Sequence, residues 1–78
     1  MENMQLYSNA FVEVFEIEID KLAELKYQDI EEWDSVGHMR LIATIEDTFD
    51  IMMDTDDIID FSSFQKGIEI LAKYNVAI

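Results

Sequence analysis

The sequence has no cysteine and no proline, and only two of its 78 residues are glycine. Without cysteine, the chain has no disulfide framework, no thiolate zinc site and no cysteine nucleophile. A turn-rich β fold depends on proline and glycine at its turns, so their scarcity disfavours that fold class. An all-α fold is the first expectation.

Long hydrophobic runs are also missing. No apolar run exceeds three residues, whereas a transmembrane helix needs about 20. The first residues, Met1-Glu2-Asn3-Met4, lack the basic and apolar regions of a secretory signal. We therefore expect one small domain over residues 1–78, monomeric and cytoplasmic, with no membrane span.

Basic residues are few, and the charge balance is strongly negative. There are 18 acidic and five basic residues, which gives a net charge of −13. Eleven of the acidic residues lie between residues 29 and 60, where Arg40 is the only base. Such a field repels the phosphates of nucleic acids, so no nucleic-acid partner is expected. Partners are expected to carry basic surfaces.

Apolar residues recur at helical spacing in the first part of the chain. A stripe over about residues 3–16 predicts a first helix; it consists of Leu6, Tyr7, Ala10, Phe11, Val14 and Phe15. A long connection is expected over about residues 17–33, with a helical turn near residues 20–22. Apolar side chains would anchor this connection: Ile17, Leu22, Leu25, Tyr27, Ile30 and Trp33. Loops of this length are uncommon and are often functional.

Three further helices are expected after the connection. Asp34 and Ser35 are good N-cap residues for a helix that continues to about Asp50. A short helical turn is predicted at about residues 56–61. Ser62 and Ser63 can cap a last helix that ends near Tyr74. The prediction is a small four-helix bundle, with three longer helices, one short helix and a long loop between the first two.

The second helix carries two different apolar faces. One sector has the width of a core-facing stripe and contains His38, Leu41, Ile42, Ile45 and Phe49. A separate, outward sector combines apolar and acidic groups: Val36, Met39, Ala43, Glu46, Asp47 and Asp50. The second sector is interpreted as a surface for docking a basic partner. The alternative is an ordinary solvated face with a few apolar residues.

Ser35 lies at the border between these sectors, at the N-terminus of the helix. Unpaired N–H groups and the positive end of the helix dipole gather at this point, so a phosphate ester on the Ser35 hydroxyl is favourably placed. The alternative is that Asp34 and Ser35 only cap the helix.

The segment Trp33-Asp34-Ser35-Val36-Gly37-His38-Met39, with the apolar and acidic positions that follow it, resembles the acyl carrier protein family. The following positions are Leu41-Ile42, Ile45-Glu46, Phe49 and Ile51. Length, acidity, the long connection, the short helix near residues 56–61 and the closing segment over residues 62–71 are also similar to that family. The resemblance covers nearly the whole chain.

The resemblance implies a carrier rather than an enzyme. A phosphopantetheinyl transferase would attach 4′-phosphopantetheine from coenzyme A to Ser35, with Asp34 and Val36 flanking the attachment point. The arm would carry acyl or aminoacyl groups as thioesters to acyl-loading, condensing or acyltransferase enzymes with basic patches. The docking surface expected for these partners consists of Val36, Met39, Ala43, Glu46, Asp47, Asp50, Asp56 and Asp57.

Longer acyl chains would insert between the second helix and its neighbours, with Ile42, Ile45, Ile58 and Phe61 as the expected lining. Carriers of primary fatty-acid synthesis usually have leucine and then an acidic residue after the serine, where this chain has Val36 and Gly37. Arg40 also stands where an acid is common. The sequence therefore looks more like carriers of specialised pathways, such as polyketide, modified-lipid, aminoacyl or surface-glycan assembly.

Other functions fit the sequence less well. A triad of Ser35, His38 and an acid lacks the Gly-x-Ser-x-Gly turn and an evident oxyanion hole, and His38 is better explained as a packed or capping residue. A calcium loop starting at Asp54 fails because isoleucine and glutamine occupy the ligand and glycine positions Ile58, Ile59 and Gln65. No metal site is expected. The serious alternative is a non-enzymatic acidic binding module or inhibitor that docks on basic surfaces. Trp33 and Met53 are expected to be packing residues.

Overall fold

The computed structural model describes residues 2–78, which form four α-helices and one 3₁₀ turn and contain no β-strand. The elements follow one another as α1 (Asn3–Phe15), the turn Ile19–Lys21, α2 (Ser35–Phe49), α3 (Thr55–Asp60) and α4 (Phe64–Ala72). The predicted all-α class is confirmed, and each predicted helix lies within two residues of its expected bounds. None of the helices over residues 2–78 is long and apolar enough to cross a bilayer.

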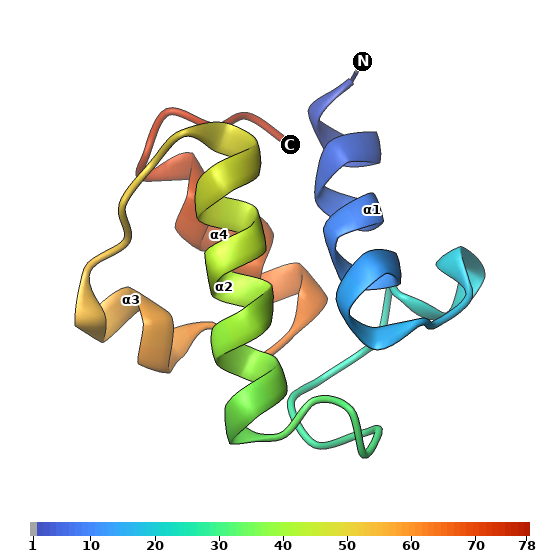
Figure 1. The fold of residues 1–78 in the computed structure, drawn as a ribbon. Helices are drawn as coiled ribbons and strands as arrows, with labels where there is room; N and C mark the ends of the chain where they lie inside the picture. The colour runs from blue at the N-terminus through green and yellow to red at the C-terminus, as the bar shows by residue number, and fades with distance from the viewer. Residues whose placement is uncertain (1) are drawn as a thin grey trace.

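The helices enclose a shared core (Figure 1). α1 and α2 run antiparallel beside each other, α4 lies behind α2 in this view, and the short α3 lies to one side of α2. The two ends of the chain lie at the same end of the molecule (Figure 1), where the Asn3 amide donates to the Ala77 carbonyl at 3.0 Å. α2 is therefore the central helix, and its first residues lie at the opposite end from the termini.

Aromatic side chains make up much of the core. Tyr7, Phe11, Trp33 and Phe61 are completely buried. Phe11 contacts Tyr7 and Trp33 edge to face, with ring centroids 5.0 and 5.6 Å apart. Such pairs add about 0.5–1.5 kcal/mol each beyond the area that they bury. The predicted role of Trp33 as an anchor of the connection is confirmed, and so is the packing role of Met53, which is 5% exposed.

Local capping explains where α2 and α4 begin. The Asp34 carboxylate accepts from the Gly37 backbone N–H at 2.8 Å, and the Ser63 hydroxyl accepts from the Lys66 N–H at 2.9 Å. Each bond satisfies a backbone donor that has no partner inside its helix. The predicted capping roles of Asp34 and Ser63 are therefore confirmed.

The two glycines allow close approaches between segments. A Cβ atom on Gly67 would collide with the Tyr7 hydroxyl and the Phe61 ring, so glycine lets α4 approach α1. The Tyr7 hydroxyl donates to the Phe64 carbonyl at 2.7 Å, and burial raises the pKa of this phenol above its ordinary range. A Cβ atom on Gly37 would collide with the Glu32 carbonyl, so glycine lets the connection pass over the first turn of α2.

The connection between α1 and α2 is ordered by apolar anchors and by backbone bonds to α4. Its anchors are the residues expected from the sequence: Leu22, Leu25 and Trp33 are buried, and Ile17, Tyr27 and Ile30 are half-buried. The Tyr27 N–H donates to the Ser62 carbonyl, and the Phe64 N–H donates to the Leu25 carbonyl, both at 2.9 Å. The segment that leads into Ser35 is thus held against the start of α4.

Candidate functional site

Ser35 is the first residue of α2, and its side chain is exposed. The neighbouring Asp34 carboxylate is occupied by its bond to the Gly37 N–H. The Ser35 Oγ atom lies 3.4 Å from the Tyr27 hydroxyl oxygen, within hydrogen-bond distance. The site therefore presents a hydroxyl at a helix start, with its neighbouring carboxylate turned to the backbone.

A pocket of about 350 Å³ opens beside this hydroxyl. The pocket, called the Ser35 pocket below, lies between the start of α2 and the segment that contains α3. Its walls come from the connection, α2, α3 and the segment that follows α3: Tyr27, Ser35, His38, Met39, Ile58, Ile59, Phe61 and Ser62. The site joins a modifiable hydroxyl to a mainly apolar hollow.

His38 forms the inner polar part of this pocket. The Trp33 indole Nε1–H donates to His38 Nδ1 at 2.9 Å, and His38 Nε2 lies 2.8 Å from the Ile58 carbonyl. Indole is only a donor and a carbonyl is only an acceptor, so the ring is neutral with its proton on Nε2. Both ring nitrogens are engaged, so His38 is not placed as a base for Ser35. The interpretation of His38 as a packed histidine bonded near the helix start is confirmed.

The expected pocket lining is only partly found. Ile58 and Phe61 line the Ser35 pocket. Ile42 and Ile45 are at most 1% exposed and lie in the core, outside the lining of this pocket, so a chain would reach them only by opening the core. Helical periodicity placed them correctly on the inward face of α2. It does not reveal that other side chains cover that face.

Most residues of the expected docking surface are exposed. Val36 and Met39 are 69% and 53% exposed, although both are apolar. Ala43, Asp47, Asp50 and Asp56 are exposed as well. Glu46 is half-buried, and its carboxylate accepts from the Met53 backbone N–H at 2.8 Å, so it also holds the segment after α2.

The placement of Asp57 on an exposed docking surface is wrong. Its side chain is buried, and it accepts hydrogen bonds from Lys73 and from the Tyr74 hydroxyl. These two bonds hold the pKa of Asp57 below its ordinary value, and the same bond to Asp57 raises the pKa of Lys73. The bond to Asp57 also raises the pKa of Tyr74. Asp57 therefore ties α3 to the end of α4 and is not available to a partner.

Sequence reasoning missed Ile59, an exposed apolar residue at the pocket. Ile59 is 71% exposed on α3, and Met52 is 84% exposed just before that helix. Ile59 extends the apolar part of the docking surface from α2 onto α3. The adjacent residues Ile58 and Ile59 in a short helix could have predicted this exposure. Two adjacent side chains cannot share one helix face, so one of them must point away from the core.

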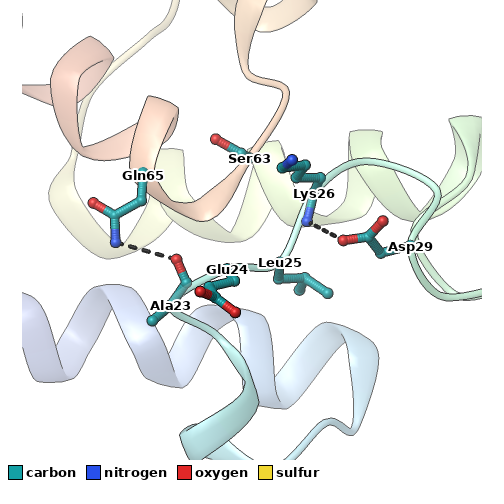
Figure 2. A pocket seen from close by; sticks show the side chains of 7 residues that line it. All are labelled: Ala23, Glu24, Leu25, Lys26, Asp29, Ser63 and Gln65. Atoms are coloured by element: carbon teal, nitrogen blue, oxygen red, sulfur yellow. Dashed lines mark hydrogen bonds between the residues drawn. The ribbon is translucent and has the colours of Figure 1, made fainter.

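A second, more polar hollow does not include Ser35 in its lining (Figure 2). Its lining comes from the connection and the start of α4: Ala23, Glu24, Leu25, Lys26, Asp29, Ser63 and Gln65. Two polar groups on its wall are already paired, because the Gln65 amide donates to the Ala23 carbonyl and the Asp29 carboxylate accepts from the Lys26 N–H (Figure 2). These bonds hold the connection in place, and the Ser63 hydroxyl of the lining caps α4.

No cluster of three or more potential metal ligands occurs among residues 2–78. Comparisons of the chain with known protein families, with curated proteins and with solved structures find no match.

Proposed function

We propose that this protein is an acyl carrier protein that is modified with 4′-phosphopantetheine on Ser35. The observation that carries the proposal is the exposed Ser35 hydroxyl at the start of α2, beside Asp34 and on the rim of the Ser35 pocket. The four-helix bundle of that family and a cytoplasmic location, where coenzyme A supplies the arm, are parts of the same proposal.

The residues around Ser35 fit a phosphodiester. The first turn of a helix leaves backbone N–H groups without intrahelical partners, and the helix dipole favours negative charge at this end. Asp34 does not point a free carboxylate at the attachment point, because its Oδ1 atom accepts from the Gly37 N–H. When bound, the arm supplies a terminal thiol that holds acyl or aminoacyl cargo as a thioester.

The docking surface would bring Ser35 to its partners. Val36 and Met39 supply apolar contact next to Ser35, while Asp47, Asp50 and Asp56 supply negative charge around it. A net charge of −13 accelerates encounters with basic surfaces and favours fast, reversible docking. The proposed partners are a phosphopantetheinyl transferase and acyl-loading, condensing or acyltransferase enzymes with basic docking patches.

Intact mass spectrometry tests the modification. Incubation with coenzyme A and a broad-specificity phosphopantetheinyl transferase should add the mass of one phosphopantetheine group to the wild type. Ser35→Ala should gain nothing. Ser62→Ala is the matched control, because Ser62 is an exposed serine on the same pocket, and this variant should be loaded like the wild type.

The second candidate function is an acidic binding module that works without an arm. The exposed apolar residues Val36, Met39 and Ile59 among acidic neighbours favour it, since this patch exists before any modification. A wild type that gains no mass, or a Ser35→Ala variant that gains as much as the wild type, would contradict the carrier function. The first of these results would favour the binding module.

A further inference from the structure

Two layers of aliphatic side chains lie behind Ser35. The outer layer lines the Ser35 pocket and contains Met39, Ile58 and Ile59. The inner layer is the buried face of α2, where Leu41, Ile42 and Ile45 are at most 1% exposed. A chain attached at Ser35 would meet the outer layer first. Tyr27, His38 and Phe61 belong both to the pocket wall and to the aromatic cluster.

The His38 ring is held by two hydrogen bonds and three aromatic contacts. Its nitrogens bond to the Trp33 indole and the Ile58 carbonyl, so the ring joins the residue before the helix cap to α3. The ring stacks on Trp33 with centroids 6.2 Å apart, and it meets Tyr27 and Phe61 edge to face at 5.5 and 6.1 Å. Any rotation of the ring would break both hydrogen bonds and leave the fully buried Trp33 with an unpaired N–H.

We infer that His38 is the residue that limits the depth of the Ser35 pocket, and that the pocket accepts short acyl groups and excludes long aliphatic chains. This inference rests on the proposed carrier function and specifies the cargo class. The Trp33–His38–Ile58 bridge lies at the pocket wall, whereas Ile42 and Ile45 are buried and are not part of that wall. The same bond to the Ile58 carbonyl holds α3 close to α2, so the pocket cannot widen while the bridge is intact.

A long chain would have to displace the imidazole to reach the inner layer. Its methylene groups would gain contact with Ile42 and Ile45, but a buried indole N–H and the Ile58 carbonyl would both lose their partner. A short chain avoids this loss, because it ends among Met39, Ile58 and Ile59. The length of the acyl chain should therefore change the surroundings of the outer-layer side chains and leave those of the inner-layer side chains unchanged.

Methyl NMR of the isoleucine side chains tests the inference directly. Ser35 is loaded from acetyl, butyryl, hexanoyl, octanoyl and decanoyl coenzyme A, and mass spectrometry confirms each product. In the wild type, the Ile58 and Ile59 methyl signals should shift with the short chains, whereas those of Ile42 and Ile45 should keep their positions up to decanoyl. Ile42 and Ile45 shifts that grow with chain length in the wild type would overturn the inference.

Two variants assign the effect to His38. His38→Leu removes both hydrogen bonds, so its Ile42 and Ile45 signals should shift once the chain reaches octanoyl. Thr44→Val, on the same helix but outside the pocket and the docking surface, should behave like the wild type. Inner-layer signals in a folded His38→Leu variant that stay as fixed as in the wild type would contradict the role of His38.

The depth of the Ser35 pocket can also be measured without the phosphopantetheine arm. This measurement separates the inference about the pocket from the carrier function. 1-Butanol and 1-octanol are titrated into the unmodified chain. Shifts confined to Ile58 and Ile59 support a shallow pocket, and octanol shifts at Ile42 and Ile45 overturn it. If the protein is never loaded at Ser35 but shows the shallow pocket, the carrier function is refuted and the inference about the pocket depth stands.

Discussion

The two sides of α3 are held by different chemistry. Towards the start of α2, the neutral His38 ring bonds to the Ile58 carbonyl beside the Ser35 pocket. Towards the end of α4, the charged Asp57 side chain accepts from Lys73 and Tyr74. A helix of six residues has little stability of its own, so these tethers decide where α3 lies. The bond between His38 and the Ile58 carbonyl, the neutral tether, shapes the pocket. The bonds of Asp57 to Lys73 and Tyr74, the charged tether, make the position of α3 depend on pH.

The largest loss of stability is expected when the neutral tether is removed. His38→Leu leaves the Trp33 indole N–H and the Ile58 carbonyl without partners, and each unpaired buried group costs about 1–3 kcal/mol. We expect the free energy of unfolding to fall by about 2–4 kcal/mol, measured by urea denaturation. Met39→Leu, on the same helix but exposed, should stay within about 0.5 kcal/mol of the wild type.

A double variant sharpens this first prediction. Trp33→Phe combined with His38→Leu removes the donor together with its acceptor, so the indole is no longer left unpaired. The double variant should therefore lose less stability than the sum of the two single variants. Strict additivity would show that the Trp33–His38 bond contributes nothing.

A smaller and pH-dependent loss is expected at the charged tether. Asp57→Asn removes the charge that Lys73 and Tyr74 recognise, and Lys73 is 61% exposed, so water screens part of the attraction. Because the folded-state pKa of Asp57 is lowered, its contribution is present above the unfolded value of about 3.9 and is lost as the pH falls through the folded value. The raised pKa of Lys73 has the opposite sign, so its contribution is present below about 10.4 and is lost as the pH rises through the folded value.

Urea midpoints of the wild type and Asp57→Asn, measured from neutral to acidic pH, test this sign. The wild type should be more stable at neutral pH, and the gap should close in acid. Asp56→Asn is the matched control, because it removes one negative charge from an exposed position on the same helix. Asp56→Asn relieves charge repulsion as much as Asp57→Asn does. If the difference in urea midpoint from the wild type closes equally in acid for both variants, the bonds of Asp57 do not cause the pH dependence.

The contrast between the tethers also shows what the sequence can predict. The caps at Asp34 and Ser63 were predictable because they bond to N–H groups three residues along the chain. The inward position of Ile42 followed from helical spacing alone. The bonds of Asp57 join it to residues 16 and 17 positions away, and no local pattern marks such pairs.

The spacing of apolar residues along a helix also does not reveal which side chains cover its apolar face. Periodicity identifies the face of a helix that is apolar, but it does not identify the side chain that lies over it. Spacing thus places Ile42 on the inward face of α2, but it does not show that Ile42 is buried and absent from the lining of the Ser35 pocket. Likewise, Asp57 is one of eleven acidic residues between residues 29 and 60, and its bonds to Lys73 and Tyr74 distinguish it from its exposed neighbour Asp56.

The smallest effect on stability is expected on the outer side of α3, which no tether uses. Ile59 is 71% exposed, so Ile59→Ser should change the free energy of unfolding by less than about 0.5 kcal/mol. If α3 belongs to the docking surface, the loss of apolar contact should raise the KM of the phosphopantetheinyl transferase for this protein and leave kcat unchanged, because only binding is weakened. Ile19→Ser is the matched control, since Ile19 is 59% exposed but lies in the connection. An equal KM for the two variants would show that the docking surface ends at α2.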